Sequence, residues 1–210
     1  MNAPLRRITS RAVWLPEANI DTDIIFPARY LLRTDREGLG ECAFRDRRYL
    51  ADGSENPVFP LNREGWRDAQ VIVGGSGFGC GSSREHAVWA LTGLGVRLVI
   101  APDFGDIFAG NAGKNGLVVL RLPSDTCDDL GRRAEAGDAF TLDIAEQTLH
   151  VGGELVASLD LPPDRQQAFL NGWDEMDLIL NRDLPDISAF ENTHRNRNPW
   201  LFSGEATNGN

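Results

Sequence analysis

The sequence predicts an α/β fold in which a central parallel sheet is joined to a second, antiparallel sheet. In the middle of the chain, short apolar runs alternate with amphipathic helical patterns, as they do where crossover helices connect parallel strands. From residue 140 onward the apolar period changes to two, which is typical of half-buried antiparallel strands. The length of 210 residues, 41% of them hydrophobic, is enough for one large domain, alone or with an appended segment.

The first third of the chain gives weak signals of regular structure. Polar residues at 19–23 precede an apolar run that ends at Pro27, which cannot continue a strand ladder. We therefore expect a loop that leads into a short helix near residues 28–32. Residues 32–66 are charged and rich in turn formers, which predicts mostly loop with brief helix.

The central third carries the regular alternation. Small and apolar residues on its main predicted helix recur at helical spacing. Ser82 and Glu85 have the spacing of a capping box at the start of that helix. The predicted elements are strands at 71–74, 96–101 and 117–122, and helices at 83–94 and near 104–112.

The last third begins with antiparallel strands. Residues 140–144 and 149–151 alternate apolar and polar side chains, and a Gly-Gly pair then turns the chain into residues 155–157. A Pro-Pro pair opens a helix that is predicted over 163–171.

The chain continues for about forty residues beyond this helix. We expect the folded domain to span residues 1–180 and residues 181–210 to form a C-terminal extension. From Glu191 onward the sequence is polar with little periodicity, so partial disorder is expected there.

Composition excludes several function classes. The net charge is −10 and the isoelectric point is near 4.8, which argues against non-specific binding of nucleic acid. No apolar run approaches the roughly 18 residues that a membrane span needs. The N-terminal residues are not followed by the apolar segment of a secretory signal, so a cytoplasmic location without membrane contact is expected.

The cysteines and histidines do not form a metal-binding pattern. Three cysteines are widely separated, and neither a Cys-x-x-Cys pair nor a paired histidine spacing occurs. We therefore expect no disulfide framework and no metal or iron–sulfur cluster held by this chain alone. The residues concerned are Cys42, Cys80, Cys127, His86, His150 and His194.

The most informative segment is glycine-rich and lies between a predicted strand and the main predicted helix. It has five glycines in the eight residues 74–81, followed by Ser82, Ser83 and Arg84. A strand that breaks into glycines and restarts as a helix presents bare backbone amides to an anion. Arg84 lies where it could bind a carboxylate or a phosphate.

Known phosphate-binding and hydrolase motifs do not fit this segment. No register of its glycines satisfies Gly-x-Gly-x-x-Gly/Ala, the dinucleotide fingerprint. Gly113-Lys114 is followed by asparagine and lacks the earlier glycine of a P-loop, and Ser76 lacks the second glycine of a Gly-x-Ser-x-Gly elbow. Nucleotide binding and serine-hydrolase chemistry are therefore disfavoured.

With these motifs excluded, residues 77–87, GFGCGSSREHA, resemble the signature of the aconitase-type swivel domain. The resemblance is closest to the small-subunit family of 3-isopropylmalate dehydratase, also called isopropylmalate isomerase. Further segments resemble the same family in the right order, so that the resemblance covers most of residues 8–180. They are residues 19–25, 99–108, 115–117 and 170–174.

The resemblance implies both a fold and a reaction. The family's small subunit is a swivelling β/β/α three-layer domain that closes over a [4Fe–4S] cluster held by a separate large subunit. Together the subunits form a hydro-lyase that interconverts 2-isopropylmalate and 3-isopropylmalate through 2-isopropylmaleate in leucine biosynthesis. The cluster acts as a Lewis acid on the substrate, a small dicarboxylic acid, and a serine of the small subunit removes a proton from carbon. No cofactor is then bound by this chain itself.

Carried onto this sequence, the resemblance makes Ser82 the general base and Arg84 the clamp for a substrate carboxylate. Ser83 and Gly81 would supply further substrate contacts. From spacing alone, Ser82 could instead cap the helix together with Glu85. Arg84 could likewise be a solvent-exposed residue of the first helical turn.

Neighbouring positions have supporting roles by the same resemblance. Asp21, Thr22 and Asp23 could order the loop beneath the site or contact the partner subunit, or they could form a plain turn. Glu85 and His86 would fix the helix start or the subunit interface. Residues expected only to pack or to stabilise local structure are Cys80, Asn111 and Lys114.

The substrate-specificity region departs from the family pattern. It comprises Leu31, Leu32, Arg33 and Thr34, in a run Tyr-Leu-Leu-Arg-Thr where homoaconitase-like members resemble Tyr-Leu-Arg-Thr. The extension after Asn181 also differs from the tail expected of the family. Two alternatives therefore stay open: a related dehydratase acting on homoaconitate, methylmalate or dimethylmalate, and a non-catalytic binding module that kept the fold.

Overall fold

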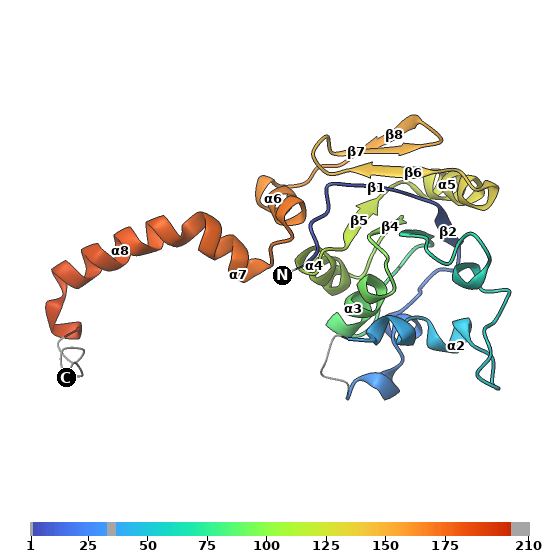
Figure 1. Cartoon of the computed structure of the whole chain (residues 1–210), viewed down its shortest axis with the longest axis horizontal. Coiled ribbons are helices and arrows are strands. Elements are labelled where there is room, and N and C mark those ends of the chain that lie inside the picture. The colour runs from blue at the N-terminus through green and yellow to red at the C-terminus, as the bar shows by residue number, and fades with distance from the viewer. Residues whose placement is uncertain (1, 33–36, 203–210) are drawn as a thin grey trace.

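Two four-stranded sheets form the centre of the molecule (Figure 1). The computed structural model describes residues 2–32 and 37–202. All residues of β3 and β4 are buried, because both faces of their sheet are covered. This sheet is parallel, in the order β2-β3-β4-β5, and its strands are Ala12–Leu15, Val71–Gly74, Leu98–Ala101 and Val118–Arg121.

The second sheet is antiparallel and covers one face of the first. Burial alternates along β6 and β7, because one face packs on the core and the other meets solvent. Phe140 and Leu142 on its inner face share a hydrophobic cluster with Val71 and Val73 of the parallel sheet. The order is β1-β6-β7-β8, and the strands are Arg7–Ser10, Phe140–Asp143, Thr148–Val151 and Glu154–Ser158.

The helices vary widely in length, and many are single turns. The α-helices among the described residues are α1 Thr22–Ile25, α2 Arg45–Arg48, α3 Glu85–Gly93, α4 Asp106–Lys114, α5 Ser124–Ala136, α6 Pro163–Asn171, α7 Glu175–Leu178 and α8 Leu184–Arg197. Short 3₁₀ turns occur at Ala28–Tyr30, Leu39–Cys42, Pro60–Asn62 and Pro199–Leu201, and a π-helical turn at Ile179–Asp183.

Helices on the other face of the parallel sheet complete a three-layer β/β/α arrangement, which confirms the predicted fold class (Figure 1). Along β3 and β4, side chains that pack towards the antiparallel sheet alternate with side chains on the opposite face, and Ile72 and Val99 belong to the second group. They join a second cluster that includes Ala87 and Leu91 of α3. The parallel sheet is therefore the middle layer, and α3 lies directly against it.

Most of the predicted central elements are confirmed, with ends that differ by a few residues. The predicted strand 71–74 and helix 163–171 have the observed bounds, and the main helix begins at Glu85. The prediction for the N-terminal third was partly wrong. Residues 22–25, expected as loop, form α1, and the helix expected near 28–32 is the 3₁₀ turn Ala28–Tyr30.

Several elements were not predicted, and long-range contacts define two of them. β1 and β2 are four-residue strands separated by Arg11, and they pair with distant strands in different sheets. α5 was missed although its sequence carries a local signal: Cys127, Leu130 and Ala134 recur at helical spacing and are buried. Trp14 of β2 lies so close to Gly131 of α5 that a Cβ atom there would overlap the indole.

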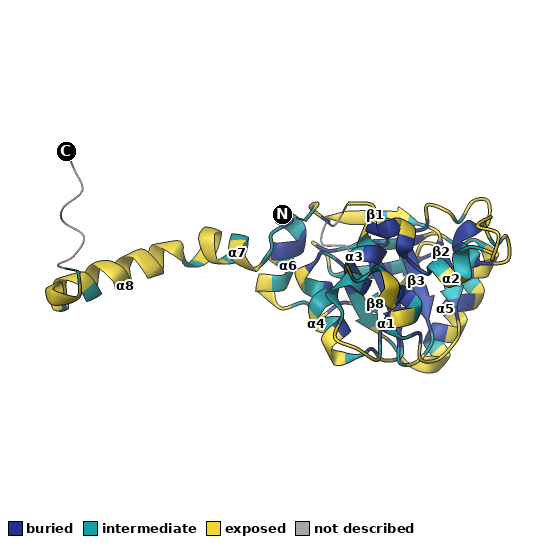
Figure 2. Cartoon of the chain, turned by 90° about the horizontal axis from the view of Figure 1, so that it is seen from below, coloured by how far each residue is buried: buried dark blue, intermediate teal, exposed yellow. Residues whose placement is uncertain are grey.

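After α6 the chain leaves the body as a helical arm (Figures 1 and 2). Helical structure continues without a break from Glu175 to Arg197, and every residue of α8 except His194 is exposed. The domain boundary at residue 180 and the partial disorder from Glu191 stay predictions, and residues 203–210 lie outside the described part. No helix among the described residues is long and apolar enough to cross a membrane.

Candidate active site

The glycine-rich loop, residues 75–84, connects β3 to α3 along a path that requires glycine. Gly77, Gly79 and Gly81 have φ angles of +73°, +71° and +91°, in the left-handed region that favours glycine. Gly79 also lies against the ring of Phe108, so that a Cβ atom there would overlap the ring. Both the backbone angles and the packing therefore restrict the course of the loop.

Asp103, just after β4, anchors the start of the loop. The hydroxyl of Ser76 and the N–H of Gly77 both donate to its carboxylate, the second over 2.5 Å. The N–H of Phe78 donates to the carbonyl of Asp103 over 3.3 Å, and the N–H of Gly105 donates to the carbonyl of Phe78 over 3.1 Å. These bonds tie the loop to the carboxyl end of the neighbouring strand, where ligand sites of open α/β sheets occur.

Thr22 and Asp21 order the other side of the loop. The N–H of buried Thr22 donates to the carbonyl of Cys80 over 2.9 Å, and its hydroxyl donates to the carbonyl of Ser82 over 3.1 Å. The carboxylate of Asp21 instead caps α1 by accepting from the N–H of Ile24 over 2.8 Å. This geometry favours the loop-ordering role over a plain turn.

Ser82 and Ser83 are exposed at the end of the loop, and neither caps α3. The capping box predicted for Ser82 and Glu85 is wrong. The carbonyl of Ser82 accepts from the N–H of Arg84 over 2.8 Å, which turns the chain before the helix, and the Glu85 carboxylate accepts from Asn115 over 2.7 Å. Within the described residues, the hydroxyl of Ser82 has no hydrogen-bond partner.

The backbone around Ser82 also has free donors. Within residues 2–32 and 37–202, the N–H groups of Gly81, Ser82 and Ser83 donate to no protein acceptor. Consecutive unbonded amides just before a helix are the donors that anion sites use. The end of the loop therefore has a set of donors that a carboxylate can accept from.

Arg84 occupies the N-cap position of α3 and forms an ion pair with Asp23. Its side chain is only 18% exposed, so the alternative of a solvent-exposed arginine is wrong, whereas the Asp23 side chain is 52% exposed. A cation at a helix N-terminus opposes the helix dipole, and the Asp23 carboxylate offsets that cost. One Nη atom bonds Asp23, and the remaining guanidinium donors have no partner in the described part of the chain.

A buried asparagine, for which sequence reasoning gave no role, fixes the start of α3. Asn115 accepts from the indole N–H of Trp89 over 2.9 Å and donates to Glu85 over 2.7 Å and to the carbonyl of Asn111 over 2.9 Å. These bonds hold the first turn of α3 against the end of α4. The only sequence signal was an Asn-Gly pair after a predicted helix, which usually marks a helix end.

Other predicted positions lie near the loop and make structural contacts. His86 stacks on the ring of Phe26 with 5.5 Å between centroids, which agrees with a role in fixing the helix start. Lys114 forms an ion pair with Glu175 over 3.1 Å. Cys80 is half-buried.

The predicted specificity region is only partly described. Leu31 packs partly buried against the core, whereas Leu32 is 93% exposed. Arg33 and Thr34 lie outside the described residues. The described half of this region is therefore apolar, and one of its leucines is free to contact a ligand.

Metal-binding groups do not gather in the described part of the chain. No set of three or more His, Cys, Asp or Glu side chains there is placed to hold a metal ion. Cys42 and Cys127 are buried. Burial raises the pKa of the Cys127 thiol to about 11, so that its metal-binding thiolate form is scarce at neutral pH.

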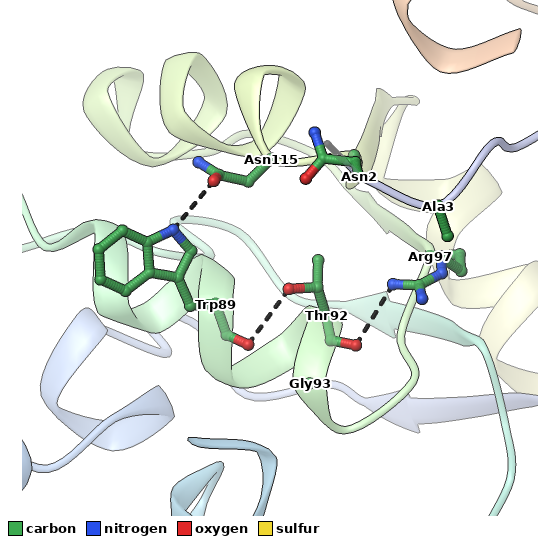
Figure 3. A pocket seen from close by; sticks show the side chains of 8 residues that line it. Asn2, Ala3, Trp89, Thr92, Gly93, Arg97 and Asn115 are labelled. Atoms are coloured by element: carbon green, nitrogen blue, oxygen red, sulfur yellow. Dashed lines mark hydrogen bonds between the residues drawn. The ribbon is translucent and has the colours of Figure 1, made fainter. Parts of the chain in front are cut away.

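A cavity of about 230 Å³ lies away from the loop, at the other end of α3 (Figure 3). Arg97 donates to the carbonyl of Thr92 over 3.3 Å, and burial lowers the pKa of Arg97. The C-terminal ends of α3 and α4 meet this cavity, and their carbonyl groups favour a cation over an anion. Neither Ser82 nor Ser83 lines this cavity, so the cavity is separate from the end of the glycine-rich loop. Its lining residues are Asn2, Ala3, Trp89, Thr92, Gly93, Arg97, Asn115 and Gly116.

Replacing Gly79 with alanine should destabilise the protein by about 2–4 kcal/mol, because it combines left-handed backbone strain with overpacking against Phe108. Urea denaturation of both proteins measures the change. Gly137→Ala is the matched control, since Gly137 also has a positive φ, +87°, but no atom within 4 Å of a Cβ there. Equal losses in the two variants would show that the ring contact is unimportant.

The sequence of this chain matches a known protein family and several curated proteins. The family model described as the aconitase C-terminal domain matches residues 4–125. The chain is 46% identical over 197 residues to the 3-isopropylmalate dehydratase small subunit of Granulibacter bethesdensis, covering 92% of this chain and 93% of that protein. The small subunit of Afipia carboxidovorans is 42% identical over 196 residues, covering 92% and 97%.

A solved structure supports the same comparison. The 3-isopropylmalate dehydratase structure from Methanocaldococcus jannaschii superposes with a TM-score of 0.61 at 26% identity. The match covers 87% of this chain and 99% of that chain.

Proposed function

The chain belongs to the aconitase C-terminal domain family and, within it, to the small subunits of 3-isopropylmalate dehydratase, and we propose that it supplies one half of that hydro-lyase's active site. The enzyme interconverts 2-isopropylmalate and 3-isopropylmalate in leucine biosynthesis, and the small subunit works with a large one. The end of the glycine-rich loop carries this proposal. There the Ser82 hydroxyl and the backbone amides of residues 81–83 have no hydrogen-bond partner among the described residues, and Arg84 is the next residue in the chain.

Proton removal is assigned to Ser82. A serine removes a proton from carbon only where its alkoxide form is stabilised, because the hydroxyl is a very weak acid in water. The unbonded amides of Gly81 and Ser83 and the guanidinium of Arg84 supply positive potential around it. As the alkoxide, the exposed Ser82 oxygen can take the proton to become the hydroxyl and then return it, without breaking any hydrogen bond to the described residues.

Binding of a substrate carboxylate is assigned to Arg84. The guanidinium is held at the start of α3 by Asp23, and its other donors are free for a carboxylate. Ser83 and Gly81 add backbone donors beside it. These groups leave the second carboxylate and the hydroxyl of the substrate without partners on this chain's loop.

We place the remaining half of the site, with the [4Fe–4S] cluster, on the large subunit. When bound there, the cluster would supply a Lewis acid for the substrate hydroxyl. This placement is supported by the separation of the cysteines within the described residues, of which Cys42 and Cys127 are buried. The cytoplasmic location expected from the sequence stays a prediction.

Steady-state assays of this chain reconstituted with its cognate large subunit test the substrate. We expect kcat/KM for 3-isopropylmalate to exceed that for homoaconitate, methylmalate and dimethylmalate by at least about tenfold, because the described part of the specificity region is apolar. The extra leucine in Tyr-Leu-Leu-Arg-Thr is the observation that keeps a related dehydratase as the second candidate. Turnover of one of the other acids without turnover of isopropylmalate would select that candidate.

A further inference from the structure

The helical arm formed by α7, the π-helical turn and α8 has an apolar face that the body does not cover. Large apolar side chains recur along it at spacings of four, four, three and three residues, which places them on one side of a helix. Their exposed fractions lie between 37% and 67%, values usual for a surface that is not in contact with protein. These residues, here named the arm stripe, are Met176, Leu180, Leu184, Ile187 and Phe190.

A helix with such a face is not stable in isolation. The arm spans Glu175 to Arg197, about 35 Å at the usual rise of a helix, and it projects away from the two sheets (Figures 1 and 2). Its base is fixed by the ion pairs of Lys114 with Glu175 and of Asp164 with Arg182. Beyond these, most helical stability in proteins comes from packing an amphipathic face, which here requires another chain.

We infer that the arm stripe docks into an apolar groove of the large subunit, an inference that rests on the proposed function. Alignments over 92% of this chain reach at least about residue 193, so relatives named as small subunits align with the sequence of α7 and of most of α8. In this chain the segment projects from the body and is apolar on one face, and such a surface is suited to bind a second subunit. The arm contributes no residue of the glycine-rich loop, so it acts in assembly and not in chemistry.

Net charge favours the large subunit over a second copy of this chain as the occupant. Each copy carries −10, so pairing two copies brings like charges together, which a different partner need not do. Aromatic and methionine side chains, which are enriched at protein interfaces, are present on the stripe as Phe190 and Met176.

The test compares two doubly charged variants of the full chain. Ile187→Asp with Phe190→Asp places two carboxylates on the arm stripe, and Ala189→Asp with Asn192→Asp places two on the opposite face of the same helix. All four positions are exposed, so the body should fold in both variants. Binding to the cognate large subunit is measured by isothermal titration calorimetry, and the mass of the small subunit alone by light scattering.

We expect the stripe variant to raise the Kd for the large subunit at least about 100-fold, the loss typical of interface hot spots, and the control variant to bind as wild type does. Wild-type affinity in the stripe variant would overturn the inference. A small-subunit dimer that only the stripe variant abolishes, with unchanged affinity for the large subunit, would also overturn it in favour of self-association. Because binding is read directly, a wild-type complex that forms but does not turn over isopropylmalate would refute the proposed function alone.

Discussion

Replacing Ser82 with alanine should lower the kcat of the reconstituted enzyme by about 10²–10⁴-fold, the range for loss of a general base. The hydroxyl has no hydrogen-bond partner within the described residues and lies among unbonded amides. Its removal should therefore abolish proton transfer by Ser82 without breaking a hydrogen bond. Steady-state kinetics with saturating large subunit measures kcat, and titration of the large subunit separates a loss of assembly from a loss of turnover.

The stability of the same variant distinguishes the two roles that the sequence left open for Ser82. Loss of a helix cap costs typically about 1 kcal/mol, whereas an exposed surface substitution stays within about 0.5 kcal/mol. Because α3 begins at Glu85 without a side-chain cap, we expect the smaller change in urea denaturation. Ser83→Ala is the control, and it should keep most of the turnover because Ser83 is assigned to act through its backbone amide. Full activity of Ser82→Ala would instead refute the assignment of Ser82 as the general base.

The sequence predicted best those parts of the fold whose local pattern and tertiary environment agree. β3 and β4 are continuous apolar runs because both faces of the parallel sheet are covered, and α3 has a clear apolar face. β1 and β2 could not be found in the same way. Each is four residues long, and its partner lies far away in the chain, so only the folded sheet defines it.

The sequence predicted which residues form the candidate site, but it did not predict their hydrogen bonds and ion pairs. The motif located Ser82 and Arg84, while spacing alone proposed a cap that does not form, because Asn115 draws the Glu85 carboxylate towards α4. Nothing in the sequence indicated that Arg84 would pair with Asp23, since 61 residues separate them. Such contacts depend on the meeting of two chain segments, which residue patterns do not specify.

Replacing Arg84 with alanine should lower kcat/KM for 3-isopropylmalate by about 10²–10⁴-fold. Two hydrogen bonds to a charged group contribute about 3–6 kcal/mol together, and each 1.36 kcal/mol corresponds to a factor of ten. The free donors of a guanidinium already held by Asp23 can make these bonds without reorganisation. The protein itself should lose little stability, because the Asp23 side chain is 52% exposed and water can solvate it once its partner is gone.

Arg84→Lys separates charge from geometry. Lysine keeps the positive charge but cannot bind a carboxylate through two parallel N–H groups, so its kcat/KM should fall between those of the wild type and of Arg84→Ala. A second control compares each variant on the substrate and on a neutral ester of it. The ester has no carboxylate charge, so a cation at position 84 cannot bind it through an ionic interaction. Bidentate binding of a carboxylate by Arg84 would be refuted by either of two results. One is that Arg84→Ala lowers kcat/KM by the same factor for the acid and for its ester. The other is that Arg84→Lys has the full activity of the wild type. The remaining role of Arg84 would then be to hold α1 against the start of α3 through Asp23, and Asp23→Asn would reproduce the loss.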